Sequence, residues 1–223
     1  MSLALFDLDN TLLGGDSDYL WGQFLVSSGI VDAEQFEKEN QRFYRDYENG
    51  TLDIVAFLNY SLGVLARHEP ERLREWRARF VEDCVRPIIL PKALALLQRH
   101  REAGDVLMII TATNRFVTQP IAELLGVPHL LATEVEVIDD RYTGRYTGVP
   151  CFQGGKVKRL MAWLDATHCD LRDSWFYSDS HNDLPLLMQV THPVAVDPDG
   201  ILAQYAQDHG WPIISLRDGP SSG

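Results

Sequence analysis

The chain has 223 residues, of which 45% are hydrophobic and 23% charged, a composition typical of a globular protein and not of a disordered or fibrous one. Its formal net charge of −12 and its pI near 4.9 disfavour binding to nucleic acid or an anionic membrane through a general basic surface. No apolar run approaches the roughly 18 to 20 residues of a membrane helix, and no basic leader precedes the first acidic motif, so we expect a cytoplasmic protein.

The first predicted element is a buried strand at residues 2–6, which runs into the acidic sequence LFDLDNTLL. Asp7 and Asp9 stand two residues apart, so they would point to the same side if the strand continued. A pair of like charges this close is unfavourable without a cation. Taken alone, the pattern is also typical of a strand followed by a turn.

Residues 14–87 break the strand rhythm, because they carry four helical patterns and no convincing strand. They begin at Gly14 and Gly15 and end in the sequence RPIILP. We predict an inserted helical domain that moves as a cap, with the two glycines as one hinge and the return connection at 86–91 as the other.

Beyond residue 88, strand and helix patterns alternate, which predicts an α/β fold with a doubly wound parallel sheet and helices on both faces. Period-two alternation between 130 and 149, with a turn at IDDR, predicts a β-hairpin. The other predicted strands are 105–111, 174–179, 193–197 and 211–215, and the predicted helices are 91–104, 115–126, 155–166, 182–190 and 200–210. The predicted domains are an α/β core (1–13 and 88–217), an all-helical cap (14–87) and a flexible tail (218–223).

Polar residues fall where the predicted parallel strands end, which is where open α/β sheets bind ligands. A lysine joins them from the start of the helix at 155–166, and Lys156 is preferred to Lys158 because the preceding glycine pair lets the backbone approach a phosphate. The two lysines cannot both face the site, since they lie about 200° apart on a helix. The candidate residues are Asp7, Asp9, Thr111, Lys156, Asp179 and Asp183.

These residues form an ordered set: a D-x-D-x-T motif, a lone threonine, a lone lysine and a D-x-x-x-D motif. The set resembles the haloacid dehalogenase superfamily, whose core is Rossmann-like, and it covers nearly the whole chain. The first motif is the specific one. A helical insertion between the first two motifs is similar to the phosphoserine phosphatase-like group of that superfamily.

The resemblance implies a Mg²⁺-dependent phosphatase for a small phosphorylated metabolite. Asp7 would attack phosphorus and form an aspartyl-phosphate, and Asp9 would protonate the leaving oxygen and then deprotonate water. The carboxylates of Asp7 and Asp179 and the backbone carbonyl of Asp9 would ligate Mg²⁺. Asp183 would orient a water on the metal, although a first-turn acid favoured by the helix dipole is a second interpretation.

Phosphate would be bound by Thr111, Lys156 and backbone N–H groups near Leu8, Asp9 and Ala112. Asn182 is a further candidate for contact with phosphate or water, and a helix N-cap explains it equally well.

The cap offers Asp16 and Asp18 as substrate contacts, and Asp16 falls where the family has an acidic residue facing the substrate. Either could instead be an N-cap for the first cap helix. No arginine lies between Arg45 and Arg67 to pair with a substrate carboxylate, which argues against phosphoserine. We therefore expect an amine-bearing phosphomonoester, with histidinol phosphate first and phosphoserine as the alternative.

Two departures from the phosphoserine phosphatase pattern bear on the substrate: Ala112-Thr113 stand in place of two glycines, and Ser178 stands in place of a glycine. A phosphotransferase of the same family differs only in the phosphoryl acceptor. A signalling receiver domain and a non-catalytic binding domain are the alternatives from other classes. Asp9 argues against a receiver domain, because a general acid promotes turnover over storage of the phosphate.

Overall fold

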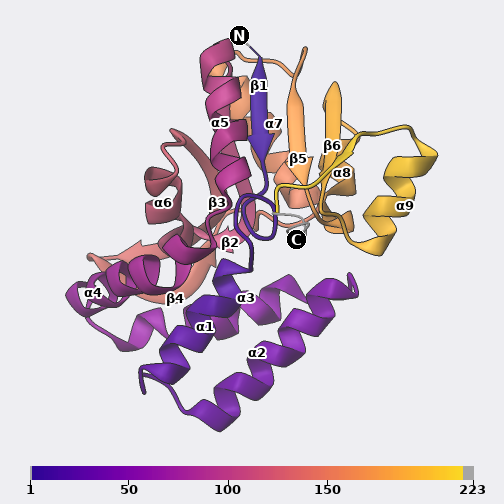
Figure 1. Cartoon of the computed structure of the whole chain (residues 1–223). Helices are drawn as coiled ribbons and strands as arrows, with labels where there is room; N and C mark the ends of the chain where they lie inside the picture. The colour runs from indigo at the N-terminus through magenta and orange to yellow at the C-terminus, as the bar shows by residue number, and fades with distance from the viewer. Residues whose placement is uncertain (1, 218–223) are drawn as a thin grey trace.

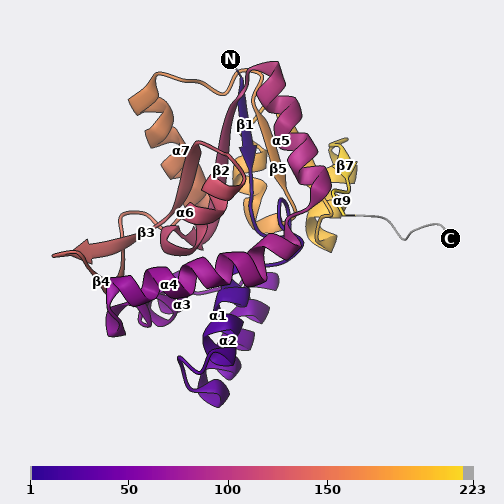
Figure 2. The ribbon, with the colours of Figure 1, turned by 60° about the vertical axis from the view of Figure 1, so that its left-hand side comes forward.

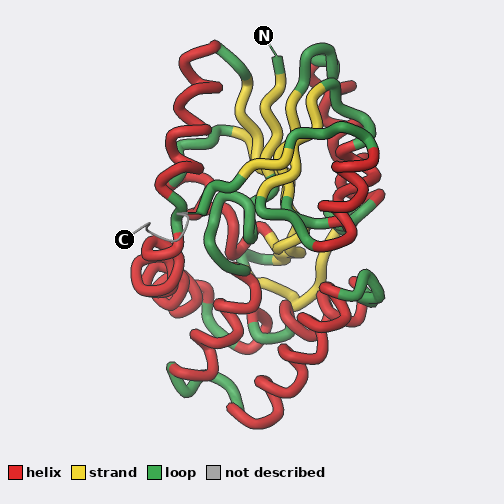
Figure 3. Tube along the Cα trace, turned by 45° about the vertical axis from the view of Figure 1, so that its right-hand side comes forward, coloured by secondary structure: helices red, strands yellow, loops and turns green. Residues whose placement is uncertain are grey.

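The computed structural model describes residues 2–217, which form a seven-stranded sheet with helices on both faces and a further group of helices beyond one end of the strands (Figures 1 and 3). The tail predicted at 218–223 lies outside these residues. Neighbouring strands are parallel except for the β3–β4 pair, which is antiparallel. In the sheet order β4-β3-β2-β1-β5-β6-β7 the strands are β1 (Leu3–Phe6), β2 (Val106–Asn114), β3 (His129–Ile138), β4 (Arg141–Thr147), β5 (Trp175–Ser178), β6 (His192–Val196) and β7 (Ile213–Ile214).

The predicted α/β class and doubly wound sheet are confirmed, and so is the hairpin, which β3 and β4 form. One strand is longer than predicted, since β2 continues three residues past Thr111. Pairing with β3 is interrupted after Ile110 and resumes at Asn114, and the hydroxyl of Thr133 donates to the carbonyl of Ala112 in the gap (2.9 Å). The side chain thus replaces a missing ladder bond.

Residues 17–80 contain the four predicted cap helices. The shorter helical elements are 3₁₀ turns at Leu65–Arg67, Arg86–Ile88 and His181–Asp183 and a π-turn at Val81–Val85. The division into core and cap stays a prediction. The α-helices are α1 (Ser17–Ser27), α2 (Ala33–Glu48), α3 (Ile54–Leu62), α4 (Pro70–Phe80), α5 (Pro91–Ala103), α6 (Arg115–Leu124), α7 (Gly154–Thr167), α8 (Leu184–Leu187) and α9 (Gly200–Asp208).

The short α8 departs from the helix predicted at 182–190, because a 3₁₀ turn capped by Ser180 precedes it. The helix starts at Leu184 and has Pro185 in its first turn, where a missing N–H is tolerated. Among the described helices, from α1 to α9, none is long and apolar enough to cross a lipid bilayer.

The first strand shows why its sequence is continuously apolar. Leu3 and Leu5 pack into the core under α7, α8 and α9, and Ala4 and Phe6 pack into the core under α5 and α6. A strand with both faces covered needs apolar residues at every position. The second core continues into the helices at 17–80, and its members there include Trp21. These helices lie below the sheet in Figure 2.

The two connections to the cap helices run side by side. Leu13 and Ile89 form an antiparallel bridge, the Gly14 N–H donates to the Ile88 carbonyl (2.7 Å), and the Leu90 N–H donates to the Leu12 carbonyl (3.2 Å). The return connection begins with a 3₁₀ turn at Arg86–Ile88. These paired connections join the helices at 17–80 to the sheet beside the carboxyl ends of its parallel strands.

Candidate active site

Two acidic residues meet because the strands before them are neighbours. Phe6 of β1 pairs with Tyr177 of β5, so Asp7 and Asp179 both emerge at the carboxyl end of the sheet. The Asp7 N–H extends the ladder by donating to the Tyr177 carbonyl (2.9 Å). β1 lies between β2 and β5, at the point where the strand order reverses, which is the usual ligand site of such sheets.

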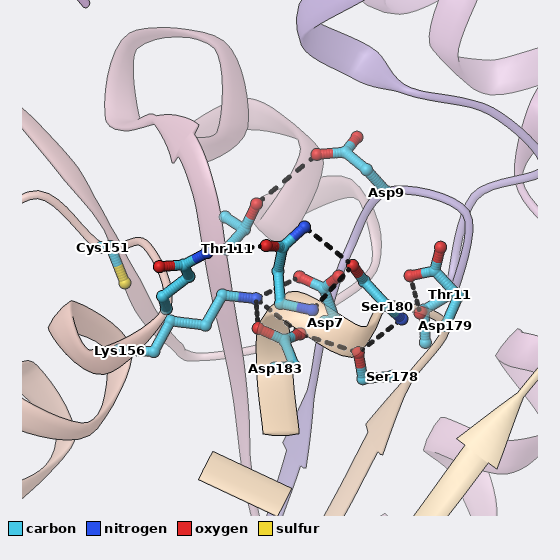
Figure 4. A network of polar contacts seen from close by, with 12 residues as sticks. Asp7, Asp9, Thr11, Thr111, Cys151, Lys156, Ser178, Asp179, Ser180 and Asp183 are labelled. Atoms are coloured by element: carbon cyan, nitrogen blue, oxygen red, sulfur yellow. Dashed lines mark hydrogen bonds and ion pairs between the residues drawn. The ribbon is translucent and has the colours of Figure 1, made fainter. Parts of the chain in front are cut away.

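A buried lysine joins two of the predicted carboxylates (Figure 4). The Nζ of Lys156 lies 2.9 Å from Asp7 Oδ1 and 2.7 Å from Asp183 Oδ1, and all three side chains are at most 5% exposed. The hydroxyl of Ser178 also donates to Asp183 (2.7 Å). Lys158 is exposed. The helix that starts after the glycine pair thus delivers one lysine to the site.

The negative charge of this site exceeds its positive charge. The pKa of Asp7 is raised to about 7, mainly by burial; repulsion from Asp183 and Asp9 contributes to the rise and Lys156 opposes it. Burial alone would lower the pKa of Lys156, but the carboxylates of Asp183 and Asp7 raise it above its usual value. Lys156 therefore stays charged, and a further cation beside these carboxylates would be stabilising.

The donor chemistry around Asp179 fits Mg²⁺. The Thr11 hydroxyl donates to Asp179 Oδ1 (3.1 Å), and burial, followed by repulsion from Asp7 and Asp183, raises the pKa of Asp179 well above its usual value. Carboxylate and carbonyl oxygens are the ligands that Mg²⁺ prefers. Within residues 2–217 no three acidic, histidine or cysteine side chains are arranged as a metal site. The Lys156 ammonium group instead binds one oxygen of Asp7 and one of Asp183.

Asp9 lies on the other side of Asp7 and faces the second motif. Its Oδ1 accepts from the Ser17 N–H and its Oδ2 from the Thr113 hydroxyl, whereas the Thr111 hydroxyl is 3.5 Å away. Burial and repulsion from Asp16 raise the pKa of Asp9 to about 6, and the hydrogen bonds from Ser17 and Thr113 oppose that rise. The Thr111 hydroxyl accepts from the Thr113 N–H (3.2 Å) and donates to Asp9 only over the longer distance, so its proton is available to a ligand.

Asn182 is buried where the turn after β5 meets α2, and it does not cap α8, contrary to the second interpretation. Its Oδ1 accepts from Gln153 (2.8 Å), and its Nδ2 donates to the backbone carbonyl of Tyr47 in α2 (3.2 Å). Ser180 caps the 3₁₀ turn by accepting from the Asn182 N–H. The amide side chain therefore links the fourth motif to α2.

The two cap acids differ in their partners. Asp16 is the N-cap of α1, and its Oδ1 accepts from the N–H groups of Asp18 and Tyr19 (2.9 Å each). No hydrogen bond from the described residues to the carboxylate of Asp18 is found, and burial, with repulsion from Asp16 and Asp9, raises its pKa well above the usual value. The N-cap interpretation is therefore correct for Asp16, and Asp18 lies in the first turn of α1.

A pocket connects these acids to the sheet. Four carboxylates, those of Asp7, Asp9, Asp16 and Asp18, meet walls contributed mainly by α2 and by the chain around α3. No lysine or arginine is found among the described residues that line it. The remaining lining residues are Tyr19, Asn40, Phe43, Tyr44, Tyr47, Leu52, Ile54, Phe57, Thr111, Ala112 and Thr113.

The sequence interpretation missed the aromatic walls and the hydroxyl of Thr113. Phe43, Tyr44 and Tyr47 recur at helical spacing, and such a stripe is more often core than ligand site. Thr113 stands two residues after Thr111, a spacing that puts both side chains on one face of an extended strand. That spacing was the signal for its approach to Asp9.

Comparison with known proteins supports the family resemblance. Residues 4–188 match the family described as haloacid dehalogenase-like hydrolase. A histidinol-phosphatase of Neisseria meningitidis serogroup C is 44% identical over 97% of this chain and 99% of its own length. The phosphoserine phosphatase SerB1 of Mycobacterium tuberculosis is 29% identical over 96% of this chain and 70% of its own.

Solved structures with the same fold include a relative of high sequence identity and a phosphoserine phosphatase. A protein of unknown function from Bordetella pertussis Tohama I is 44% identical and superposes with a TM-score of 0.91 over 97% of this chain and 99% of its own. A substrate-bound phosphoserine phosphatase shares the fold at 18% identity, with a TM-score of 0.71 over 97% and 93% of the two chains. The chain belongs to the haloacid dehalogenase-like hydrolase family and is a phosphatase.

Proposed function

We propose that the chain is a Mg²⁺-dependent phosphatase that hydrolyses histidinol phosphate through an aspartyl-phosphate on Asp7. The choice of substrate rests on the pocket, which presents acidic and aromatic side chains and, among its described lining residues, no lysine or arginine. The relative named histidinol-phosphatase supports the same choice. A small amine-bearing metabolite is the partner, and the cytoplasmic location stays a prediction.

The two motif-one acids have separate roles in this proposal. Asp7 attacks phosphorus, and Asp9 gives a proton to the leaving alkoxide and later takes one from the attacking water. Asp7 is 3% exposed and lies against Lys156, whereas Asp9 faces the cap side of the pocket. The nucleophile is thus on the sheet side and the acid on the substrate side.

The phosphate oxygens are bound by Thr111, Lys156 and the N–H groups near Leu8, Asp9 and Ala112. Thr111 is 1% exposed, and the hydrogen bond that its hydroxyl donates, to Asp9, is long at 3.5 Å. Donors fixed in a dry site stabilise the charge that develops on phosphoryl oxygens without reorganising. Asn182 reaches phosphate only through its neighbours, because its amide already bonds Gln153 and Tyr47.

The carboxylates of Asp7 and Asp179 and the backbone carbonyl of Asp9 would hold Mg²⁺, and Asp183 would orient a water on it. When bound, the ion would supply positive charge to the phosphate and to the two carboxylates. The elevated pKa values of Asp7 and Asp179 support this cation requirement. Asp183 is already held by Lys156 and Ser178, which fits a residue that orients water rather than one that ligates the metal directly.

The substrate's cationic end pairs with Asp18 in this proposal, and its imidazole packs among the aromatic walls. Asp18 has no hydrogen-bonded partner among the described residues, whereas one carboxylate oxygen of Asp16 accepts hydrogen bonds from the N–H groups at the start of α1. Aromatic faces attract cations and stack on planar rings. A phosphoserine carboxylate would instead meet four carboxylates without a guanidinium.

The purified enzyme with Mg²⁺ should show a higher kcat/KM for histidinol phosphate than for phosphoserine. Asp18→Asn should lower kcat/KM for histidinol phosphate by about 10- to 100-fold, the value of one charge-assisted contact. It should affect p-nitrophenyl phosphate, which has no amine, much less. The matched control is Asp165→Asn, since Asp165 is exposed on α7 and is not among the residues that line the pocket. Better turnover of phosphoserine, or equal losses on both substrates in Asp18→Asn, would contradict the assignment.

The turn after α2 rests on the core through Gly50, whose φ is +68°. A Cβ there would lie 2.8 Å from His181 Nε2, and the Nδ1 of His181 is held 2.7 Å from Asp199. In our proposal, this contact helps to hold α2 and its aromatic residues over the site.

Gly50→Ala should therefore reduce both stability and kcat/KM. The left-handed backbone costs about 1–2 kcal/mol for a residue with a side chain, and the clash with His181 moves α2. Gly29→Ala is the control, because Gly29 has φ +65° and nothing within 4 Å. Thermal melts should show a loss in both variants and kinetics a loss only in Gly50→Ala; an equal kinetic effect would refute the role of this contact.

A further inference from the structure

The carboxylate of Asp9 is held from two parts of the fold. The N–H of Ser17, the first residue of α1, donates to Asp9 Oδ1 (2.6 Å), and the hydroxyl of Thr113 in β2 donates to Asp9 Oδ2 (2.9 Å). One donor comes from the cap side and the other from the sheet. Two bonds to different oxygens fix the plane of the carboxyl group as well as its position.

Thr113 also contacts the second motif. Its N–H donates to the Thr111 hydroxyl (3.2 Å), so one residue connects Asp9 to the phosphate-binding threonine. Thr113 is 5% exposed, and its hydroxyl has its hydrogen-bond partner in Asp9. Glycine at this position, as in the phosphoserine phosphatase pattern, could supply the N–H but no hydroxyl.

We propose that Thr113 is a positioning residue that orients Asp9 for proton transfer to the leaving oxygen. The inference rests on the proposed role of Asp9. A carboxylate has about four lone-pair sites, and the bonds from Ser17 and Thr113 use one on each oxygen. The remaining sites are thereby aimed in fixed directions, and Asp9 lines the pocket that receives the leaving group.

The proton balance is simple. As the bond from Asp7 oxygen to phosphorus forms, the bond from phosphorus to the leaving oxygen breaks, and that oxygen receives the proton of Asp9. In the second half, Asp9 takes a proton from the water that attacks phosphorus, and Asp7 is released as a carboxylate. A misoriented Asp9 should therefore slow the reaction most for substrates whose leaving oxygen must be protonated as it departs.

Leaving-group dependence separates positioning from general damage. Alkoxides leave only when protonated, whereas p-nitrophenolate is stable without a proton. Thr113→Val keeps the shape and removes the hydroxyl, and it should lower kcat/KM, which covers the steps up to departure of the leaving group, for histidinol phosphate by on the order of 10- to 100-fold, less than the about 10²- to 10⁴-fold of a lost general acid. The loss on p-nitrophenyl phosphate should be markedly smaller, and Thr113→Ser should recover most of the activity.

Asp9→Asn is the benchmark, and it should show the same discrimination with larger losses. If the parent enzyme does not hydrolyse histidinol phosphate, the comparison uses whichever alkyl phosphomonoester it does hydrolyse. Equal losses on both substrates in Asp9→Asn would refute the acid role itself. Discrimination by Asp9→Asn but not by Thr113→Val, in a variant whose thermal midpoint matches the parent, would overturn the positioning role alone.

Discussion

Replacing Asp7 with asparagine should reduce phosphatase turnover by roughly 10⁴-fold or more, because the variant lacks the nucleophile of a covalent mechanism. The protein should remain folded. Asparagine has nearly the shape of aspartate, and the exchange removes the attraction to Lys156 together with the repulsion from Asp183 and Asp9. The measurements are kcat with histidinol phosphate and p-nitrophenyl phosphate, and the thermal midpoint.

Asp165→Asn is the matched control, since Asp165 is exposed on α7. That variant should keep the activity and stability of the parent. A folded Asp7→Asn protein that retained substantial turnover of either substrate would remove Asp7 as the nucleophile, and the phosphoryl acceptor would then have to be another group or water.

Replacing Lys156 with methionine should destabilise the protein and impair catalysis together. Two buried carboxylates, Asp7 and Asp183, lose the cation between them, and breaking a buried ion pair by removing one partner costs about 3–5 kcal/mol. The loss of a phosphate-binding cation should also lower kcat by on the order of 10²- to 10³-fold. Urea unfolding with a chelator present measures the first effect without compensation by Mg²⁺.

Lys158→Met provides the comparison on the same helix. Because Lys158 is exposed, the free energy of unfolding of the Lys158→Met protein should differ from that of the parent by at most about 0.5 kcal/mol, and its kcat should equal that of the parent. Stability of Lys156→Met equal to the parent would mean that the carboxylates take up protons instead of needing the lysine, and the charge state assigned to the site would be wrong.

Much of the architecture could be predicted because its sequence signals are local. A continuous apolar run such as Leu3–Phe6 indicates a strand covered on both faces, and glycine at the end of α5 marks its termination, with Gly104 at φ +78°. Alternation of strands and helices then leaves few topologies, since crossovers between parallel strands are right-handed. The ends of the parallel strands follow from the same pattern, which is why the acids could be placed together.

The pocket could not be predicted in the same way. Phe43 and Tyr47 lie on an amphipathic helix, and the periodicity of α2 shows which residues share a face but not whether that face meets a core or a cavity. The partners of Asp16 and Asp18 depend on where α1 begins, which a sequence of several adjacent N-cap residues leaves open. The interruption after Ile110 depends on the hydroxyl of Thr133, which is distant in sequence.

The central claim is that Asp7 carries the phosphoryl group taken from histidinol phosphate, and trapping that acyl phosphate tests it most directly. The enzyme is mixed with histidinol phosphate and Mg²⁺ and quenched during turnover, and borohydride then reduces an aspartyl-phosphate to homoserine. Peptide mass mapping should find homoserine at position 7, dependent on substrate and absent from Asp7→Asn. Turnover that proceeds with no homoserine at position 7, or with the modification at another aspartate, would contradict the mechanism.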